Sequence, residues 1–309
     1  MASGRLLLVP SEAAATGQAT AYVRTSDGRA LAYEEQGDPG GVPVFSLHGT
    51  PGSRLSGLHP DPAKVTDAGL RLISYDRPGY GGSTRQHGRS VVDCVSDIVT
   101  IADELGLERF AVTGGSGGAP HALATAARLP ERVTRVECNV GPAPYEAEGL
   151  DYFEGMDREN VKEFGWALAG EDTLVPQLER EAHKALDRLD VDPASLLSEF
   201  DLSDADRAVL AQEVVKQRMR ISFREAMAQG IGGWVDDDLA CVRPWRFDLA
   251  EITVPVRVRY GATDVLVPAA HGAWLASHIP GALVLVDEVS GHMSTPDERL
   301  ERIRAFVSA

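Results

Sequence analysis

The chain has 309 residues, of which 43% are hydrophobic and 25% charged, and its 46 acidic and 30 basic side chains give a formal net charge of −16. An apolar fraction of this size in a chain of this length supports a folded core and excludes intrinsic disorder as the main state. The negative charge repels phosphate backbones and anionic lipid, so it argues against nucleic-acid or membrane binding and favours a small-molecule substrate as the partner.

Residues 1–19 are rich in small and hydroxyl-bearing side chains and are predicted to form a flexible leader. A hairpin follows, because the Asp27-Gly28 dipeptide lies between extended segments at 21–24 and 30–35. Buried strands are predicted at 42–47, 70–75, 110–113 and 133–140, with helices at 90–105 and 119–128 between them. This alternation indicates an α/β fold with a mostly parallel sheet covered on both faces.

The alternation stops at residue 145 and resumes after residue 247. The stretch between has long charged helical segments at 179–189 and 204–228 and no convincing strand. Strands at 254–260 and 282–286 and helices at 269–278 and 297–307 follow it. We therefore predict an α/β core made of residues 20–144 and 248–309, interrupted by a helical cap at residues 145–247. A glycine cluster at 230–233 is either a hinge or an ordinary loop.

Three cysteines, Cys94, Cys138 and Cys241, form no C-x-x-C pair and are odd in number, which is typical of a reducing compartment. The apolar run at 6–9 is too short for a signal peptide, and no stretch is long enough to span a bilayer. We therefore expect a cytoplasmic protein. No cluster of His, Cys, Asp or Glu has metal-ligand spacing, so we expect no metal and no cofactor. The sequence leaves a monomer and a homodimer equally open.

The strongest catalytic signal follows the predicted strand at 110–113. The segment GGSGG at 114–118 fits the pattern G-x-S-x-G between a strand and a helix. In such a nucleophile elbow the serine backbone is strained, and only small residues fit two positions away on either side. A P-loop is excluded because no Gly-Lys-Ser/Thr follows, and a G-x-G-x-x-G frame starting at Gly115 ends on Pro120. Ser116 is therefore the candidate nucleophile.

A serine nucleophile needs a base, and the base needs a third group that orients it. In this architecture the acid follows a late strand and the histidine follows the last one. Asp264 comes after the predicted strand at 254–260, and His292 comes after the one at 282–286. The order Ser116, Asp264, His292 therefore fits a catalytic triad. The alternatives are structural, with Asp264 as a helix N-cap and His292 as a loop histidine.

A tetrahedral intermediate also needs hydrogen-bond donors for its oxyanion. One donor is expected to be the backbone N–H of Gly117, directly after the nucleophile. The second is expected from the loop at 48–53, and the N–H of Thr50 is the best candidate because Pro51 has none. His48 is interpreted as a brace of this loop and not as a catalyst.

Three segments stand in order along the chain: HGTPG at 48–52, DRPGYGGS at 76–83 and the GGSGG elbow at 114–118. Together they resemble the α/β-hydrolase superfamily, in particular its capped branch of serine hydrolases. The resemblance implies an eight-stranded, mostly parallel sheet flanked by helices, with a helical cap inserted after the sixth strand. It also implies an acyl-enzyme on Ser116, hydrolysed by water that His292 activates while Asp264 orients the imidazole.

The serine at position 116 excludes the relatives with an aspartate nucleophile, the epoxide hydrolases and haloalkane dehalogenases. Proline iminopeptidases resemble the first loop but usually have Asp-Gln-Arg-Gly where this chain has DRPG at 76–79. We predict a serine hydrolase that cleaves a small, mostly apolar, neutral ester or lactone. An aminopeptidase similar to proline iminopeptidase, a C–C bond hydrolase with the same triad and a catalytically silent ligand-binding protein stay open.

The predicted cap holds 10 of the 19 aromatic residues, and Tyr145, Trp166 and Trp234 are the candidates for substrate binding. The alternative is that these rings pack the cap's own core. The cap also holds 23 acidic and 12 basic side chains, so −11 of the net charge of −16 lies in it. We therefore expect the entrance to repel anionic substrates and to favour release of a carboxylate product.

Overall fold

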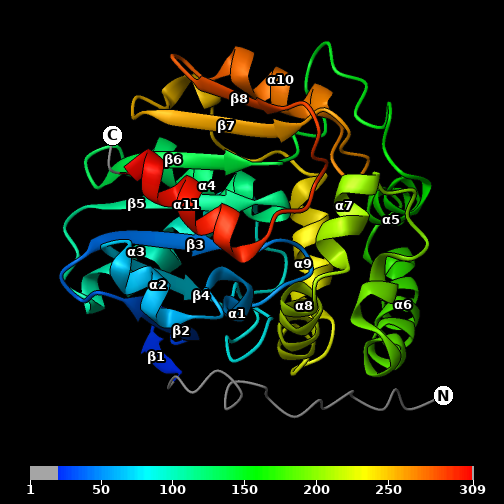
Figure 1. Cartoon of the computed structure of the whole chain (residues 1–309), viewed down its shortest axis with the longest axis horizontal. Helices are drawn as coiled ribbons and strands as arrows, with labels where there is room; N and C mark the ends of the chain where they lie inside the picture. Colours follow the sequence, from blue (N-terminus) through cyan, green and yellow to red (C-terminus); the bar gives the residue numbers. More distant parts are fainter. Residues whose placement is uncertain (1–19, 308–309) are drawn as a thin grey trace.

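The computed structural model describes residues 20–307, so the predicted leader at 1–19 lies outside the described residues. The strands are β1 (Ala21–Arg24), β2 (Ala30–Gly37), β3 (Val42–Leu47), β4 (Leu70–Tyr75), β5 (Phe110–Gly115), β6 (Val133–Asn139), β7 (Val256–Gly261) and β8 (Leu283–Asp287). They form one sheet in the order β1-β2-β4-β3-β5-β6-β7-β8 (Figure 1). The predicted α/β class is confirmed.

Only the first strands of the sheet run antiparallel. β1 pairs with β2 in the predicted hairpin, β2 pairs antiparallel with β4, and every later neighbour is parallel. Because parallel neighbours need crossover connections, helices lie between them along the chain. The carboxyl ends of β3, β5, β6 and β7 therefore meet at one edge of the sheet, on the right in Figure 1. This is the edge where α/β proteins hold their ligands.

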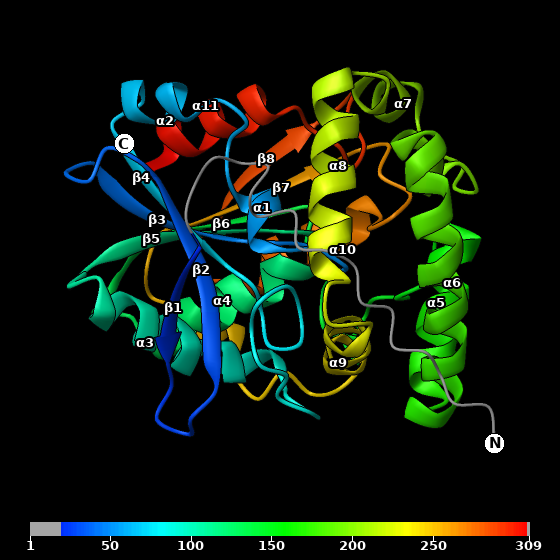
Figure 2. The same cartoon turned by 90° about the horizontal axis from the view of Figure 1, so that it is seen from below.

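The helices of the core cover the two faces of the sheet. They are α1 (Arg54–Gly57), α2 (Pro62–Asp67), α3 (Cys94–Glu104), α4 (Ala119–Arg128), α10 (Ala269–His278) and α11 (Pro296–Val307). Side chains alternate along each strand, so Phe45 and Ile73 pack toward α3 and α4, whereas Val44 and Leu72 pack toward α2 and α11. Figure 2 shows the two helical layers on opposite sides of the sheet.

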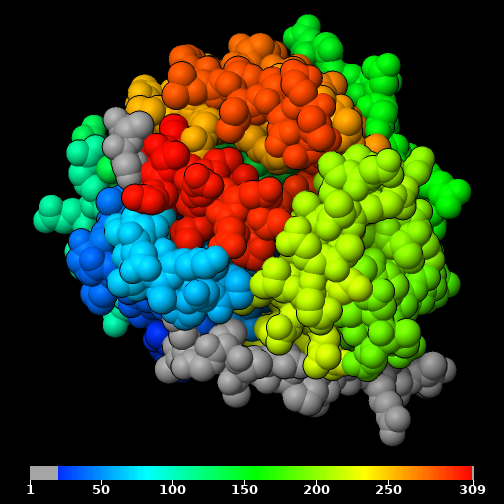
Figure 3. All heavy atoms as spheres, in the orientation of Figure 1, coloured from blue at the N-terminus to red at the C-terminus, as the bar shows by residue number. Residues whose placement is uncertain are grey.

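Between β6 and β7 the chain is helical, and we call this segment the insertion. It contains α5 (Arg158–Leu168), α6 (Glu171–Val191), α7 (Asp204–Leu210), α8 (Glu213–Ala226) and α9 (Gly232–Cys241). The insertion has an apolar core of its own, to which Leu174, Leu178 and Trp234 contribute. It lies beyond the carboxyl ends of the strands, and its yellow-green atoms pack directly against the red C-terminal segment (Figure 3).

Two predictions for the insertion were wrong in detail. The segment at 204–228 is two helices and not one, because the chain leaves α7 after Leu210 and starts α8 at Glu213. The glycine cluster is neither a free hinge nor a plain loop, because α9 begins at Gly232. Gly233 packs against the ring of Tyr80 in the core, where an added Cβ would approach a ring carbon to 2.6 Å. A close contact between insertion and core therefore requires this glycine.

The last strand differs from the expectation of a sheet covered on both faces. β8 is an edge strand, and its Leu283 and Val284 are 58% and 53% exposed. Packing explains this, because α10 lies on β7 and α11 reaches β6, so no described helix covers β8. The three cysteines are all buried and unpaired. No helix within residues 20–307 has the length and hydropathy that crossing a membrane requires.

Candidate active site

Ser116 lies at a sharp turn between β5 and α4. Its φ is +52°, a left-handed conformation that residues with a side chain rarely adopt. The strand ends at Gly115, and a single helical turn at Ser116–Gly118 leads into α4. The turn places Ser116 at the carboxyl edge of the sheet, where it is half-buried like Gly115, whereas Gly117 and Gly118 are buried. The predicted strand, turn and helix are therefore all present.

The glycines at both ends of the elbow are required by backbone packing. A Cβ on Gly114 would lie 2.3 Å from the carbonyl oxygen of Gly118. A Cβ on Gly118 would lie 2.5 Å from the carbonyl oxygens of Leu47 and His48. Backbone atoms cannot move aside, so any larger side chain would open the turn. Gly115 is different, because its nearest neighbour would be a side-chain nitrogen of Asn139 at 3.8 Å.

Asp264 and His292 meet across the loops that follow β7 and β8. Oδ2 of Asp264 lies 2.8 Å from Nδ1 of His292, and Oδ1 accepts the backbone N–H groups of Leu266 and Val267, each at 2.9 Å. Asp264 thus caps the turn after it with one oxygen and holds the imidazole with the other. The predicted alternative of a helix N-cap is wrong, because the backbone after Asp264 only bends and α10 does not begin until Ala269, whereas the contact with His292 is the one that an orienting acid requires.

The environment of His292 favours its protonated form. Burial opposes a charge on the imidazole, but the charge and hydrogen bond of Asp264 outweigh burial and raise the pKa of His292 above its usual value. With Nδ1–H donated to Asp264, Nε2 carries the lone pair that a base needs. Among the described residues no direct hydrogen bond joins Ser116 to His292, although both side chains line the same cavity. Catalytic hydrogen bonds of this kind often shorten only when substrate binds.

The loop at 48–53 lies against the elbow. A Cβ on Gly117 would lie 3.2 Å from the backbone nitrogen of Thr50, so the two predicted oxyanion donors are neighbours. The N–H of Gly117 is in the first turn of a helix, where amides have no partner within the helix. The hydroxyl oxygen of Thr50 is also close to Gly117, since a Cβ on Gly117 would lie 2.3 Å from it, and the hydroxyl donates to Oδ2 of Asp237 at 2.6 Å.

Residues of the first two motifs hold this loop from behind. Nε2 of His48 accepts the backbone N–H of Arg77, and Arg77 donates to the carbonyl oxygens of His48 and Gly49. Burial and the neighbouring Arg77 lower the pKa of His48 well below its usual value, so its ring is neutral. His48 is therefore a brace, as the sequence predicted.

An aspartate of α9, which the sequence analysis missed, completes this brace. Asp237 is fully buried and bonds Arg77 at 2.6 Å, Arg89 at 2.6 Å and the hydroxyl of Tyr80 at 2.9 Å, besides Thr50. Burial alone would raise the pKa of Asp237, but the two arginines outweigh burial and hold it well below its usual value. The insertion thus carries the counter-ion of the oxyanion loop. The only sequence signal was the run of three aspartates at 236–238.

A second aspartate of the insertion holds the histidine loop. Asp206 of α7 accepts the backbone N–H of His292 at 3.1 Å with Oδ2 and that of Met293 at 2.8 Å with Oδ1. Asp206 is 1% exposed, and a Cβ on Gly291 would collide with its carboxylate. The insertion therefore contacts both catalytic loops through buried carboxylates.

A cavity of about 350 Å³ lies between the insertion and the side chains of Ser116 and His292. Ser116, His292, Thr50 and Leu266 line it from the core, and Trp166 and Trp234 line it from α5 and α9. Tyr145, the third predicted substrate-binding residue, is not among the lining residues. Its ring packs edge-on against Tyr152, with centroids 5.3 Å apart, because the turn after β6 carries it into a cluster of aromatic rings.

The insertion side of this cavity also carries charged groups. Lys184 pairs with Glu181 at 2.8 Å and Arg188 pairs with Glu199, so these charges largely cancel. Glu163 is different, because it accepts from the indole of Trp234 at 2.8 Å and lies beside the carboxyl of Asp238. Burial raises the pKa of Asp238 well above its usual value, and the charge of Glu163 raises it further. Burial also raises the pKa of Glu163, so the surroundings shift both carboxyl groups toward the protonated form.

The described residues contain no group of three or more His, Cys, Asp or Glu side chains arranged around a common point for a metal ion. The arrangement that is present, a serine on a strained turn beside an imidazole held by a carboxylate, suits acyl transfer to a hydroxyl.

Comparisons with known proteins show which fold family the chain belongs to. The chain is 27% identical over 269 residues to the dihydrolipoyllysine-residue acetyltransferase component of the acetoin cleaving system from Pseudomonas putida, an alignment that covers 86% of this chain and 62% of that protein. It is 38% identical over 117 residues to a proline iminopeptidase from Xylella fastidiosa, covering 36% of each. The alignments therefore span less than two thirds of either relative.

Among solved structures, an esterase from Exiguobacterium antarcticum superposes with a TM-score of 0.66 at 20% identity, covering 94% of this chain and 100% of that one. Identity this low shows a common fold. The family described as alpha/beta hydrolase fold matches residues 42–298, which include all three motifs and the triad positions. The chain belongs to the alpha/beta hydrolase fold family.

Proposed function

We propose that this protein is a serine hydrolase that cleaves a small, mostly apolar, neutral ester or lactone. The observation that carries the proposal is the 2.8 Å contact between Asp264 and His292, made on the wall of the cavity into which Ser116 is raised. An imidazole fixed in this tautomer has one ring nitrogen left to act as a base, and the hydroxyl of Ser116 on the same cavity is a nucleophile that such a base can activate.

In the proposed reaction Nε2 of His292 takes the proton of Ser116 as its oxygen attacks the carbonyl carbon of the ester. The oxyanion accepts hydrogen bonds from the N–H groups of Gly117 and Thr50. The imidazolium, stabilised by Asp264, then gives its proton to the departing alkoxide, which leaves an acyl-enzyme. Water, deprotonated by the same nitrogen, hydrolyses that acyl-enzyme and releases a carboxylic acid.

The cavity supports an apolar substrate. Trp166, Met219, Phe223 and Leu266 give it apolar walls, and most of its charged side chains are paired with one another. In this proposal the insertion acts as the cap, because it closes the cavity over the triad. Residues 145–247, which make up most of the insertion, have a net charge of −11, and this charge favours a neutral substrate over an anionic one.

A panel of p-nitrophenyl esters with short and medium acyl chains tests the proposal. We expect wild-type protein to hydrolyse some of them, and Ser116→Ala to lose at least about 10³-fold in kcat. Thermal unfolding of both proteins checks that the substitution leaves the fold intact. If folded wild type and Ser116→Ala are equally inactive across the panel, the proposed ester hydrolysis is wrong.

A second candidate, an aminopeptidase similar to proline iminopeptidase, is favoured by one observation. The carboxylates of Glu159 and Glu163 lie on the wall of the catalytic cavity, where they could receive a substrate ammonium group. The local similarity to the Xylella relative points in the same direction. Turnover of proline β-naphthylamide that exceeds turnover of all esters in the panel, and that falls in Glu163→Gln, would put this candidate first.

A further inference from the structure

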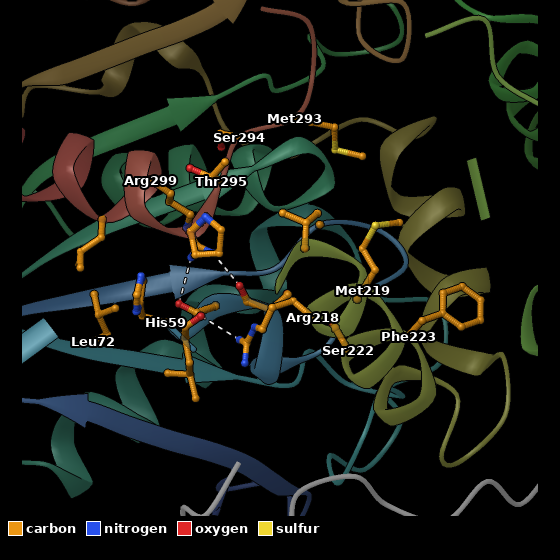
Figure 4. A pocket seen from close by; sticks show the side chains of 18 of the residues that line it. His59, Leu72, Arg218, Met219, Ser222, Phe223, Met293, Ser294, Thr295 and Arg299 are labelled. Carbon is orange, nitrogen blue, oxygen red and sulfur yellow. Dashed lines mark hydrogen bonds between the residues drawn. The ribbon is translucent and has the colours of Figure 1, made fainter. Parts of the chain in front are cut away.

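A second cavity, of about 340 Å³, adjoins the catalytic one (Figure 4). It lies between α8 of the insertion and α1 and α11 of the core. Its walls are largely apolar, with Leu58, Leu72, Val215, Leu300 and Ile303 among them. Pro51, Met219, Phe223 and Met293 line both cavities, so one wall is common to the two.

Two arginines, from different parts of the chain, line this second cavity. Arg299 of α11 donates to the carbonyl oxygens of Ser56 at 2.6 Å and Gly57 at 3.0 Å and to the hydroxyl of Ser46, which leaves two of its five N–H groups without a described partner. Arg218 of α8 donates to the carbonyl oxygen of Leu58 at 2.8 Å. Three consecutive carbonyls at the end of α1 thus bring both guanidinium groups to the same place. Arg218 uses one hydrogen bond to described residues, which leaves most of its five N–H donors for another partner.

No carboxylate within residues 20–307 forms an ion pair with either arginine. The acidic groups whose charges reach them are Glu34 for Arg218 and Glu137 for Arg299. Both carboxylates are already bonded to other arginines, Glu34 to Arg54 and Glu137 to Arg257 and Arg302. The positive charge in this cavity is therefore not matched by the surrounding protein.

Titration does not remove this charge. Burial lowers the pKa of Arg218 to about 10 and, together with the charges of Arg302 and Arg218, lowers that of Arg299 to about 10. Both guanidinium groups stay protonated at neutral pH. Two like charges held close together in partly apolar surroundings are costly, and an anion between them would lower that cost.

We propose that this cavity binds a small monocarboxylate with an apolar body, such as an aliphatic acid. The carboxylate accepts hydrogen bonds from the unused N–H groups of Arg218 and Arg299, a geometry that guanidinium groups suit. The apolar body lies against Leu58, Val215 and Ile303. The apolar walls argue against a polyanion, which would need more donors than two arginines supply. This proposal goes beyond ester hydrolysis and does not depend on it.

If the contacts with α1 were their only role, the two arginines would only hold the carbonyl groups at the end of that helix, as structural braces. A brace needs hydrogen bonds to carbonyl groups, which a neutral glutamine can also give, but it needs no empty space around the charge. The cavity beside both side chains, and the donors of Arg218 that point to no described residue, are what separate a binding site from a brace.

Calorimetric titration with hexanoate and with hexanamide, its neutral counterpart of nearly equal shape, tests the proposal. We expect wild-type protein to bind hexanoate at least tenfold more tightly than hexanamide. Arg218→Gln should remove this preference. Arg220→Gln, which removes an exposed arginine from the same helix, should keep it. Equal binding of the two ligands by wild type, or a preference that survives Arg218→Gln, would overturn the proposal.

A second measurement uses the wild-type protein and guards against misfolding of Arg218→Gln. Phenylglyoxal modifies accessible arginine side chains, and peptide mapping by mass spectrometry reports which ones. We expect hexanoate, but not hexanamide, to slow the modification of Arg218 while leaving Arg220 unaffected. Modification of Arg218 at the same rate with and without hexanoate would contradict the proposal. Both readouts measure binding, so they separate failure of this site from failure of the proposed hydrolase activity.

Discussion

The hydrogen bond between Asp264 and His292 determines the pH dependence that the proposed chemistry must show. The base must be neutral to take a proton from Ser116, and Asp264 raises the pKa of His292. Activity should therefore be lost as the pH falls through this raised pKa, and the acidic limb of the kcat/KM profile should lie above the usual pKa of histidine, about 6.5.

Asp264→Asn tests this dependence. Without the negative charge the pKa of His292 falls, so the acidic limb of the profile should move to lower pH, while kcat drops by about 10⁴-fold because the tautomer is no longer fixed. The profile is measured with the best ester of the panel. A limb that stays in place after the substitution would show that Asp264 does not set the protonation of the base.

The glycines of the elbow make a prediction with an internal control. Gly114→Ala places a Cβ 2.3 Å from a backbone oxygen, whereas Gly115→Ala meets no atom closer than 3.8 Å. We expect Gly114→Ala to lower the free energy of unfolding by about 1–3 kcal/mol and to abolish activity. Gly115→Ala should keep the stability and the activity of the wild-type protein. Urea unfolding and ester turnover check the pair, and equal effects of the two substitutions would refute the packing argument.

Functional residues that stand in a local sequence pattern can be predicted from the sequence. Residues whose partners are distant in the chain cannot. Ser116, Asp264 and His292 stand in local patterns at strand ends, so sequence was enough to place them. Asp206 and Asp237 have no such pattern, because their partners lie 86 and about 160 residues away in the chain. Only its aromatic ring suggests Tyr145 as a substrate-binding residue, and in the structure this ring packs against other aromatic rings and does not line the cavity.

The helices of the insertion do more than cover the cavity. α9 supplies Asp237 to Arg77, Arg89 and Thr50, and α7 supplies Asp206 to the loop of His292. Each helix therefore contacts one of the two core loops that carry the candidate residues Thr50 and His292. A movement of the insertion would change the geometry of the oxyanion donors and of the base together.

Asp237→Asn tests the contact made by α9. The substitution leaves two buried arginines without a counter-ion, which typically costs about 3–5 kcal/mol, and it frees the Thr50 loop, so kcat should fall as well. Asp236→Asn is the matched control, because its partner Arg85 has a side chain that is 38% exposed and can be solvated. Chemical denaturation should show that Asp237→Asn lowers the free energy of unfolding much more than Asp236→Asn. Comparable losses in the two variants would contradict the role of Asp237 as the counter-ion of the buried arginines.

The boundaries of most elements followed from the sequence, and the failures have a physical cause. The strands from β1 to β7 matched apolar runs bounded by turn residues. The break between α7, which ends at Leu210, and α8, which begins at Glu213, contains no glycine or proline that would signal it in the sequence. The sequence does not predict α9, because the helix begins with two glycines, of which the second, Gly233, is required by the contact with Tyr80.

The distribution of charge over the whole molecule sets two opposite preferences for anions. The segment at 145–247 has a net charge of −11, which repels anions at long range, whereas Arg218 and Arg299 attract a carboxylate only at contact. Salt distinguishes the long-range repulsion from the attraction at contact. It screens exposed charges over a Debye length of about 10 Å at 0.1 M but screens buried groups much less.

Hydrolysis of an anionic and a neutral ester at rising salt concentration measures the long-range repulsion of anions. Between about 0.01 and 0.1 M sodium chloride, kcat/KM for mono-p-nitrophenyl succinate should rise by roughly twofold or more, because screening removes the repulsion. The value for p-nitrophenyl butyrate should change little. A fall in kcat/KM for the anionic ester would show that its approach is governed by attraction.

The central claim is that Ser116 is a nucleophile activated by His292, and covalent labelling tests it without knowledge of the substrate. Native protein is treated with a fluorophosphonate, digested and mapped by mass spectrometry. We predict one adduct, on Ser116, that is absent in Ser116→Ala and forms much more slowly in His292→Ala. A folded wild-type protein that carries no adduct at Ser116 would contradict the claim and would favour a silent ligand-binding protein.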